Sequence, residues 1–207
     1  MSSPSNRRIF LKVVLLSICV FPRRVAARQR FGLTVKTNFL RPPGAVSEEF
    51  FAAKCIRCGR CVEVCPYRCV APLGLEGGVM AGTPLIDVEQ IPCYLCMKCA
   101  EICPSGALQK IAQEKTRMGL AIVDQYSCVA WQDQTLCRTC YSVCPFPDKA
   151  IRLEQFRPVV DERHCTGCGI CTHACPVSRQ RGGKAINIEP IYATEFSLPS
   201  DDGTVTR

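Results

Sequence analysis

The sequence predicts an α+β chain that is rich in loops, built from internal repeats and organised around a small hydrophobic core. Three observations lead to this prediction. The 207 residues include 18 cysteines, which recur at regular spacings from Cys55 onward. Fifteen prolines, fourteen glycines and only 7% aromatic residues leave few of the large side chains that fill a core. Short strand-like runs separate the cysteine-rich segments.

Composition and charge exclude several classes of function. The sequence contains no run of 18 or more apolar residues, which excludes a polytopic membrane protein. It contains no GxGxxG or GxxxxGK pattern, which argues against a nucleotide site. The first 27 residues hold five basic and no acidic side chains, which leaves 21 basic and 18 acidic residues in the remainder. Since that remainder has no basic stripe interleaved with aromatic residues, we expect no nucleic-acid partner.

Residues 1–27 are typical of an export signal. The segment from Asn6 to Lys12 contains Arg7 and Arg8 and resembles a twin-arginine signal. The mainly apolar stretch of nine residues that follows (13–21) would extend only about 14 Å as a helix, which is too short to cross a membrane. Small residues end the segment, so cleavage is expected after Ala27. The alternative is a disordered basic arm or an amphipathic anchor.

A group of four cysteines that ends in Cys-Pro occurs four times. Copies one, two and four read C-x2-C-x2-C-x3-C-P, whereas copy three has eight residues between its first two cysteines. The sixteen cysteines of the four copies are Cys55, Cys58, Cys61, Cys65, Cys93, Cys96, Cys99, Cys103, Cys128, Cys137, Cys140, Cys144, Cys165, Cys168, Cys171 and Cys175.

This spacing suits an iron–sulfur cubane. Three cysteines at i, i+3 and i+6 on a tight loop bind three irons, and the fourth, followed by proline, binds the neighbouring cluster in two-cluster ferredoxins. Gly59, Gly167 and Gly169 allow the backbone to approach the inorganic sulfides. The sequence therefore predicts four [4Fe-4S] clusters, with the sixteen cysteines as their ligands.

Other uses of the cysteines fit the spacing less well. A disulfide framework needs separated partners, and thiols at x2 spacing in four consecutive blocks are poorly positioned for it. Structural zinc normally uses two separated C-x2-C pairs for each tetrahedral site. The stretched third copy leaves open a vacant, three-iron or differently ligated site.

The intervals between copies predict the remaining structure. Each interval reads as two short strands and a turn, and the second strand ends in an aspartate ahead of the next cysteine loop: Asp87, Asp124 and Asp161. The predicted unit is thus strand, cysteine loop, short helix and strand, as in ferredoxin-like repeats. We divide the chain into the signal (1–27), a linker or N-terminal arm (28–50), a four-cluster domain (51–190) and a mobile tail (191–207).

The resulting pair of two-cluster ferredoxin modules allows two arrangements. The copies could pair in sequence, first with second and third with fourth, or in a nested manner, second with third and first with fourth. The nested arrangement resembles the four-cluster subunits of molybdenum oxidoreductases, and we favour it on that resemblance.

Blocks outside the cysteines resemble the MauM/NapG group of ferredoxin-type proteins. These blocks are Arg41-Pro-Pro-Gly-Ala45, Ile91-Pro-Cys93, Arg117 to Gln125 and the long first gap of copy three. The resemblance implies a periplasmic protein, exported by the twin-arginine route, that is membrane-associated through an integral-membrane iron–sulfur partner. That partner would oxidise quinol, and the electrons would reach a periplasmic cytochrome or reductase of the nitrate reductase type.

Three alternatives to this function stay open. The chain could be the iron–sulfur subunit of a molybdopterin oxidoreductase, a component of methylamine oxidation or a zinc-organised interaction module. No nucleophile–base set or carboxylate pair stands out, so we expect electron transfer without an independent catalytic site. His164 and His173 are expected not to bind iron, because the cysteine set is complete without them. Cys69 is expected to be a small buried residue or a free thiol, and the alternative is that it substitutes for a ligand.

Overall fold

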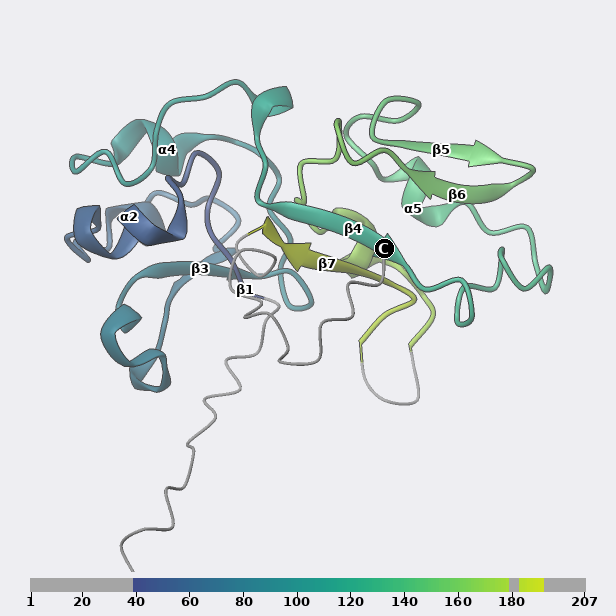
Figure 1. The fold of residues 1–207 in the computed structure, drawn as a ribbon, viewed down its shortest axis with the longest axis horizontal. Helices are drawn as coiled ribbons and strands as arrows, with labels where there is room; N and C mark the ends of the chain where they lie inside the picture. Colours follow the sequence, from purple (N-terminus) through teal and green to yellow (C-terminus); the bar gives the residue numbers. More distant parts are fainter. Residues whose placement is uncertain (1–38, 179–182, 192–207) are drawn as a thin grey trace, which may run out of the picture. The chain divides into compact units, whose positions relative to one another are not determined.

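The computed structural model describes residues 39–178 and 183–191. The predicted export signal at 1–27, residues 28–38 of the predicted linker and the predicted tail after Ile191 lie outside these ranges. Within them, no helix is long and apolar enough to cross a membrane. The described residues form two modules that each place a two-strand hairpin between two cysteine loops, the N-terminal module (39–118) and the C-terminal module (119–191) (Figure 1).

In the N-terminal module a central hairpin lies between two cysteine loops. Its elements are β1 (Phe39–Leu40), α2 (Glu48–Lys54), α3 (Arg60–Glu63), β2 (Val70–Pro72), the 3-10 helix η2 (Leu75–Met80), β3 (Pro84–Asp87), α4 (Lys98–Ile102) and the 3-10 helix η3 (Gln113–Lys115). Strands β2 and β3 pair antiparallel, and β1 pairs with the other edge of β3. The ends of the module are paired by an isolated antiparallel bridge between Ala45 and Leu108.

The C-terminal module also has a hairpin between its two cysteine loops, and its first and last strands pair with each other. Its elements are β4 (Gly119–Val123), α5 (Thr139–Ser142), β5 (Ile151–Glu154), β6 (Arg157–Val160), α6 (Ile170–Ala174) and β7 (Ile186–Pro190). Strands β5 and β6 form the hairpin between the cysteine loops, and β4 and β7, the first and last strands of the module, pair antiparallel over five residues (Figure 1). The predicted repeat of strand, cysteine loop, short helix and strand is therefore present in both modules.

Two expectations from the sequence were wrong in detail. The interval after Cys103 forms no hairpin, because β4 pairs with β7 from the far end of the module rather than with the residues next to Cys103. The predicted linker also belongs to the fold in its second half: β1 joins a sheet, and Arg41 is buried next to α2. Local strand patterns could not show either pairing, because both partners are distant in sequence.

The block Arg41-Pro-Pro-Gly-Ala45 closes the N-terminal module. The guanidinium of Arg41 donates to Thr83 Oγ1 at 2.9 Å and to the carbonyl of Pro84 at 2.8 Å, and it forms a bidentate ion pair with Glu48. Gly44 has φ +81°, and a Cβ there would lie 2.1 Å from the carbonyl oxygen of Gln109. Only glycine permits this close approach, which brings the two ends of the module together.

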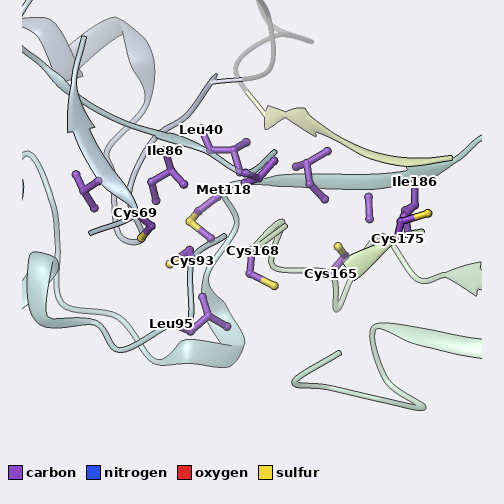
Figure 2. Packing of buried hydrophobic residues seen from close by; sticks show 14 of the residues in the cluster. Leu40, Cys69, Ile86, Cys93, Leu95, Met118, Cys165, Cys168, Cys175 and Ile186 are labelled. Carbon is purple, nitrogen blue, oxygen red and sulfur yellow. The ribbon is translucent and has the colours of Figure 1, made fainter. Parts of the chain in front are cut away.

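The core is small, as expected, and much of it is sulfur. The larger cluster of buried residues joins aliphatic side chains such as Leu40, Ile86 and Ile188 to six cysteines (Figure 2). A second cluster, around Phe51, packs under α4. The larger cluster contains residues from both modules, so the two modules share one core.

Candidate iron–sulfur cluster sites

The cysteines of the described residues surround four separate cavities. Each cavity is lined by the first three cysteines of one copy and the fourth cysteine of another copy. We name them site A (Cys55, Cys58, Cys61 and Cys103), site B (Cys93, Cys96, Cys99 and Cys65), site C (Cys165, Cys168, Cys171 and Cys144) and site D (Cys128, Cys137, Cys140 and Cys175).

These sets correct the favoured nested pairing. Cys65 of copy one lies with copy two, and Cys103 of copy two lies with copy one. Copies three and four exchange Cys144 and Cys175 in the same way. The pairing is therefore sequential, because each antiparallel hairpin turns the second copy of a module back onto the first.

The three tight loops share one backbone conformation. In each, the residues immediately before and after the second cysteine have φ between +55° and +80°. These pairs are Arg57 and Gly59, Leu95 and Met97, and Gly167 and Gly169. Sequence reasoning identified the three glycines but missed Arg57, Leu95 and Met97, because side chains disfavour this conformation. Two successive turns of this hand bring three thiols to one side of the loop.

Copy three reaches the same result by a different route. Its stretched loop is attached to β6, because the indole N–H of Trp131 donates to the carbonyl of Pro158 at 3.1 Å. The guanidinium of Arg157 lies 5.5 Å from the centre of the Trp131 ring. Cys128 and Cys137 consequently line one cavity despite their longer separation, and site D is lined by four thiols.

The aspartate ahead of copies two, three and four shapes the entry to each loop. The carboxylates of Asp87, Asp124 and Asp161 each accept a bond from the backbone N–H two residues later, at 2.8 to 3.1 Å. Their backbone carbonyls accept a bond from the N–H four residues later. At Asp161 the N–H of Arg163 is the main cause that lowers the pKa of the carboxyl group. The recurring aspartate is thus a turn-forming residue.

Several of the buried thiols inside the loops resist ionisation without a positive partner. Burial, with the charge of neighbouring thiolates, raises the pKa of Cys61, Cys140 and Cys168 to about 11 and that of Cys99 to about 12. A metal that binds these sulfurs must displace their protons. Bound iron would supply the positive charge that these buried thiolates need.

Backbone N–H groups counteract burial at Cys103. Burial alone would raise the pKa of its thiol, but bonds from backbone N–H groups and from Ser105 lower it, and the N–H of Leu108 lies 3.4 Å from Cys103 Sγ. Donors of this kind stabilise thiolate and sulfide in iron–sulfur sites. The residues around the cavities therefore suit a cluster: soft thiol ligands, with N–H donors beside them.

The geometry of the cysteines can also be compared with a disulfide framework and with structural zinc sites. The seventeen cysteines of the described residues are all free thiols. Among the same residues, no group of three or more His, Cys, Asp or Glu side chains is arranged to hold a single metal ion. The thiols stand around cavities instead, which is the arrangement that a multi-atom cluster requires.

The other singled-out residues divide into two groups. His164 and His173 are exposed and line none of the four cavities; His164 Nδ1 lies 3.4 Å from Asp161 Oδ2. Cys69, in contrast, lines site B, and its Sγ lies 3.5 Å from Cys65 Sγ. The position of Cys69, four residues after Cys65 and directly before β2, is the sequence signal that could have placed it at site B.

The four sites follow one another in a single series. Sites A and B belong to the N-terminal module, and sites C and D to the C-terminal module. Sites B and C meet at the junction, where the N–H of Cys93 donates to the carbonyl of Cys168 at 2.9 Å. Figure 2 shows Cys93 and Cys168 near each other, beside Met118. The order through the molecule is therefore A, B, C and D.

Comparison with known proteins agrees with these sites. A family described as a 4Fe-4S dicluster domain matches residues 54–107, which contain copies one and two. A family described as a 4Fe-4S binding domain matches residues 156–177, which contain copy four. The first match treats copies one and two as a single two-cluster unit, in agreement with the sequential pairing.

Curated relatives extend the likeness to most of the chain. It is 41% identical to the ferredoxin-type protein NapG of Escherichia coli K12 over 175 residues, which cover 77% of this chain and 74% of the relative. It is 35% identical to the methylamine utilization ferredoxin-type protein MauM of Methylorubrum extorquens over 205 residues, which cover 91% of this chain and 90% of the relative. The chain therefore belongs to the family of ferredoxin-type proteins that includes NapG and MauM, and it is a 4Fe-4S electron-transfer protein.

Proposed function

We propose that the chain carries four [4Fe-4S] clusters, one in each of sites A to D, in two modules of two clusters. The sixteen cysteines of the four copies are the ligands. The observation that supports this count is that every cavity is lined by three cysteines of one loop and a fourth from its paired loop. A bound [4Fe-4S] cluster accepts and releases one electron at a time.

The chain's own residues then form a relay through the protein. Four thiols at each site saturate the four irons of a cubane, so no iron is left open for substrate. Apolar side chains such as Ala121, Ile151 and Ile188 line site C and keep water from it. The hydrogen bond between Cys93 and Cys168 joins the middle two sites. The protein would thus transfer electrons without an independent catalytic site.

We infer that the relay works in the periplasm, between a membrane protein and a soluble acceptor. The donor would be an integral-membrane iron–sulfur protein that oxidises quinol, through which this chain is associated with the membrane. The acceptor would be a periplasmic cytochrome or reductase of the nitrate reductase type. Two observations support this inference: the 41% identity to NapG, and the twin-arginine pattern at Arg7 and Arg8.

A role in methylamine oxidation is the second candidate. Its support is the alignment with MauM, which has lower identity than the NapG alignment but covers 91% of this chain. The two candidates differ in the acceptor. Reduced protein mixed with the acceptor of each system under anaerobic conditions should be reoxidised rapidly by one of them. Co-purification with a large molybdopterin-bearing chain would instead favour a permanent oxidoreductase subunit.

Metal analysis of anaerobically purified full-length protein tests the cluster count. Four clusters predict about sixteen iron and sixteen acid-labile sulfide per chain. Electron paramagnetic resonance after dithionite should show interacting reduced clusters, since the four sites are adjacent. Zinc without sulfide would refute the proposal, and about twelve iron would indicate that site D or another site is incomplete.

Fractionation of cells tests the location. Replacement of Arg7 and Arg8 by lysine should retain the protein in the cytoplasm with its clusters intact, because the twin-arginine route transports folded proteins and reads this pair. The unaltered chain, expressed in parallel, should appear in the periplasm. Periplasmic protein in the double-lysine variant would contradict this route.

A further inference from the structure

Site B has one thiol more than a cubane needs. Besides its four assigned cysteines it is lined by Cys69, which is 6% exposed and lies outside the four Cys-Pro copies. Sites A and D are lined by four cysteines each. Site C also touches a fifth, Cys140, but Cys140 is one of the three loop cysteines of site D. Cys69 has no second site.

The backbone holds Cys69 in this position. Arg68 has φ +54°, and its N–H donates to the carbonyl of Cys65 at 3.1 Å, so the chain turns back on itself between the two cysteines. Val70, the next residue, is buried and pairs with Ile86 in the sheet. The position of Cys69 is therefore fixed by the start of β2 and does not depend on a flexible loop.

The sulfur of Cys69 lies between two assigned ligands of site B. Its Sγ is 3.5 Å from Cys65 Sγ, and its thiol also donates a hydrogen bond to the sulfur of Cys93. Figure 2 shows the side chains of Cys69 and Cys93 facing each other. The fourth ligand of a cubane binds a single iron, so the requirement is one thiolate within reach of that iron. A change of side-chain rotamer moves a sulfur over a distance comparable with the gap between Cys65 and Cys69.

We propose that Cys69 is a reserve ligand of site B, able to bind the iron that Cys65 binds; this rests on the proposed presence of a cluster there. In the exchange, the Cys69 thiol gives its proton to water and its thiolate forms the new Fe–S bond. The Fe–S bond of Cys65 breaks, and its sulfur takes up a proton. No electron is gained or lost, so the cluster keeps its oxidation state.

The test compares Cys65→Ala with Cys103→Ala in full-length protein purified without oxygen. Both variants lose the fourth ligand of a site in the same module, but site A has no fifth thiol. Cys65→Ala should keep the iron and sulfide content of the unaltered protein. Cys103→Ala and the double variant Cys65→Ala/Cys69→Ala should each lose between one and four iron per chain, as a three-iron cluster or an empty site.

A second measurement reports on Cys69 directly. In Cys65→Ala, ligation should protect Cys69 from alkylation under native conditions, and removal of iron by a chelator should restore its reaction. Cys69→Ala alone should retain its full iron, since Cys65 is present, while the reduction potential of one cluster shifts. If Cys65→Ala does not yield folded protein, Cys65→Val fills the side-chain volume without offering a ligand atom and permits the same two measurements.

Two results would overturn the role of Cys69 as a reserve ligand. Both can be told apart from the absence of clusters in the unaltered protein. The first is equal iron loss in Cys65→Ala, the double variant and Cys103→Ala. The second is a Cys69 in Cys65→Ala that is alkylated while iron is still bound. If the unaltered protein itself contained no iron, the proposed function would fail and Cys69 would have no cluster to bind.

Discussion

Both modules place a two-strand hairpin between two cysteine loops, but the two ends of each module are joined differently. In the C-terminal module β4 and β7 form a five-residue ladder, whereas the N-terminal module has one bridge between Ala45 and Leu108. The cavity of site A is about 290 Å³, compared with about 20 Å³ at sites C and D. Cys58 at site A is exposed, while Cys168 at site C is buried.

The comparison shows that equal cysteine spacing does not produce equal enclosure. Copies one and four have the same pattern and the same pair of left-handed residues. What differs is the packing around them: Gly167 approaches the backbone of Gly119 in β4, whereas a Cβ at Gly59 would meet nothing within 4 Å. The enclosure of a cluster site therefore depends on the strands β4 and β7 and on the junction between the two modules.

The largest expected effect contrasts a buried with an exposed ligand. Cys168→Ala should remove the cluster of site C and destabilise both modules, because Cys168 lies in their shared core and metal binding contributes on the order of 10 kcal/mol to folding in small metal domains. Cys58→Ala should cost the iron of site A only. Iron analysis with thermal unfolding measures both variants, and equal loss of stability would contradict the comparison.

Arg41 provides the second test. Its side chain helps to hold the N-terminal module together, as the β4–β7 ladder does in the C-terminal module. Arg41→Ala leaves the partly buried Glu48 without its partner and should cost about 3 kcal/mol. Arg41→Lys keeps the positive charge but not the bidentate geometry, so it should recover only part of the lost stability.

Hydrogen exchange locates the effect of the Arg41 variants. Protection should fall in α2, β1 and β3, which the Arg41 side chain joins or adjoins, and stay unchanged in the β4–β7 ladder. Loss of protection spread evenly over both modules would mean that the N-terminal edge is not closed by Arg41 in particular.

A matched pair of glycines separates loop strain from packing at the junction. Gly59 and Gly169 occupy the same position after the second cysteine, with φ +74° and +80°. Alanine at either position should cost about 1 kcal/mol for the left-handed conformation. At Gly169 the new Cβ would also lie 2.3 Å from Val88 Cβ, which should add about 2 kcal/mol of overpacking.

Anaerobic thermal unfolding, followed by visible absorbance, compares these two variants. Gly169→Ala should unfold at the lower temperature, and Val88→Ala in the same chain should relieve part of the difference. Equal midpoints for Gly59→Ala and Gly169→Ala would argue that the junction does not pack as described.

The smallest effect concerns the stretched loop of copy three. Trp131→Phe removes the hydrogen bond to Pro158 and should cost about 1 kcal/mol. Site D should then release iron to a chelator faster than in the unaltered protein. Tyr126→Phe is the control, since Tyr126 in the same region is 92% exposed, and an equal rate in the two variants would remove the role assigned to Trp131.

Much of the fold could be predicted from local patterns. The short helices, the hairpin β5–β6 and the strand at Pro84–Asp87 lie where the intervals between copies indicated. The left-handed residues Leu95 and Met97 could not be predicted, because nothing in their side chains favours that conformation. The partner of β4 could not be predicted either, since β7 lies beyond two further cysteine loops.

The sequence by itself determined the chemistry, because spacing along the chain decides which thiols share a loop and proline decides where that loop ends. The tertiary structure alone decided which loop provides the fourth thiol of each site, the order of the four sites and the fifth thiol at site B. These depend on antiparallel pairing and on turns such as Arg68, which bring distant residues together. Contacts of that kind leave no periodic mark in the sequence.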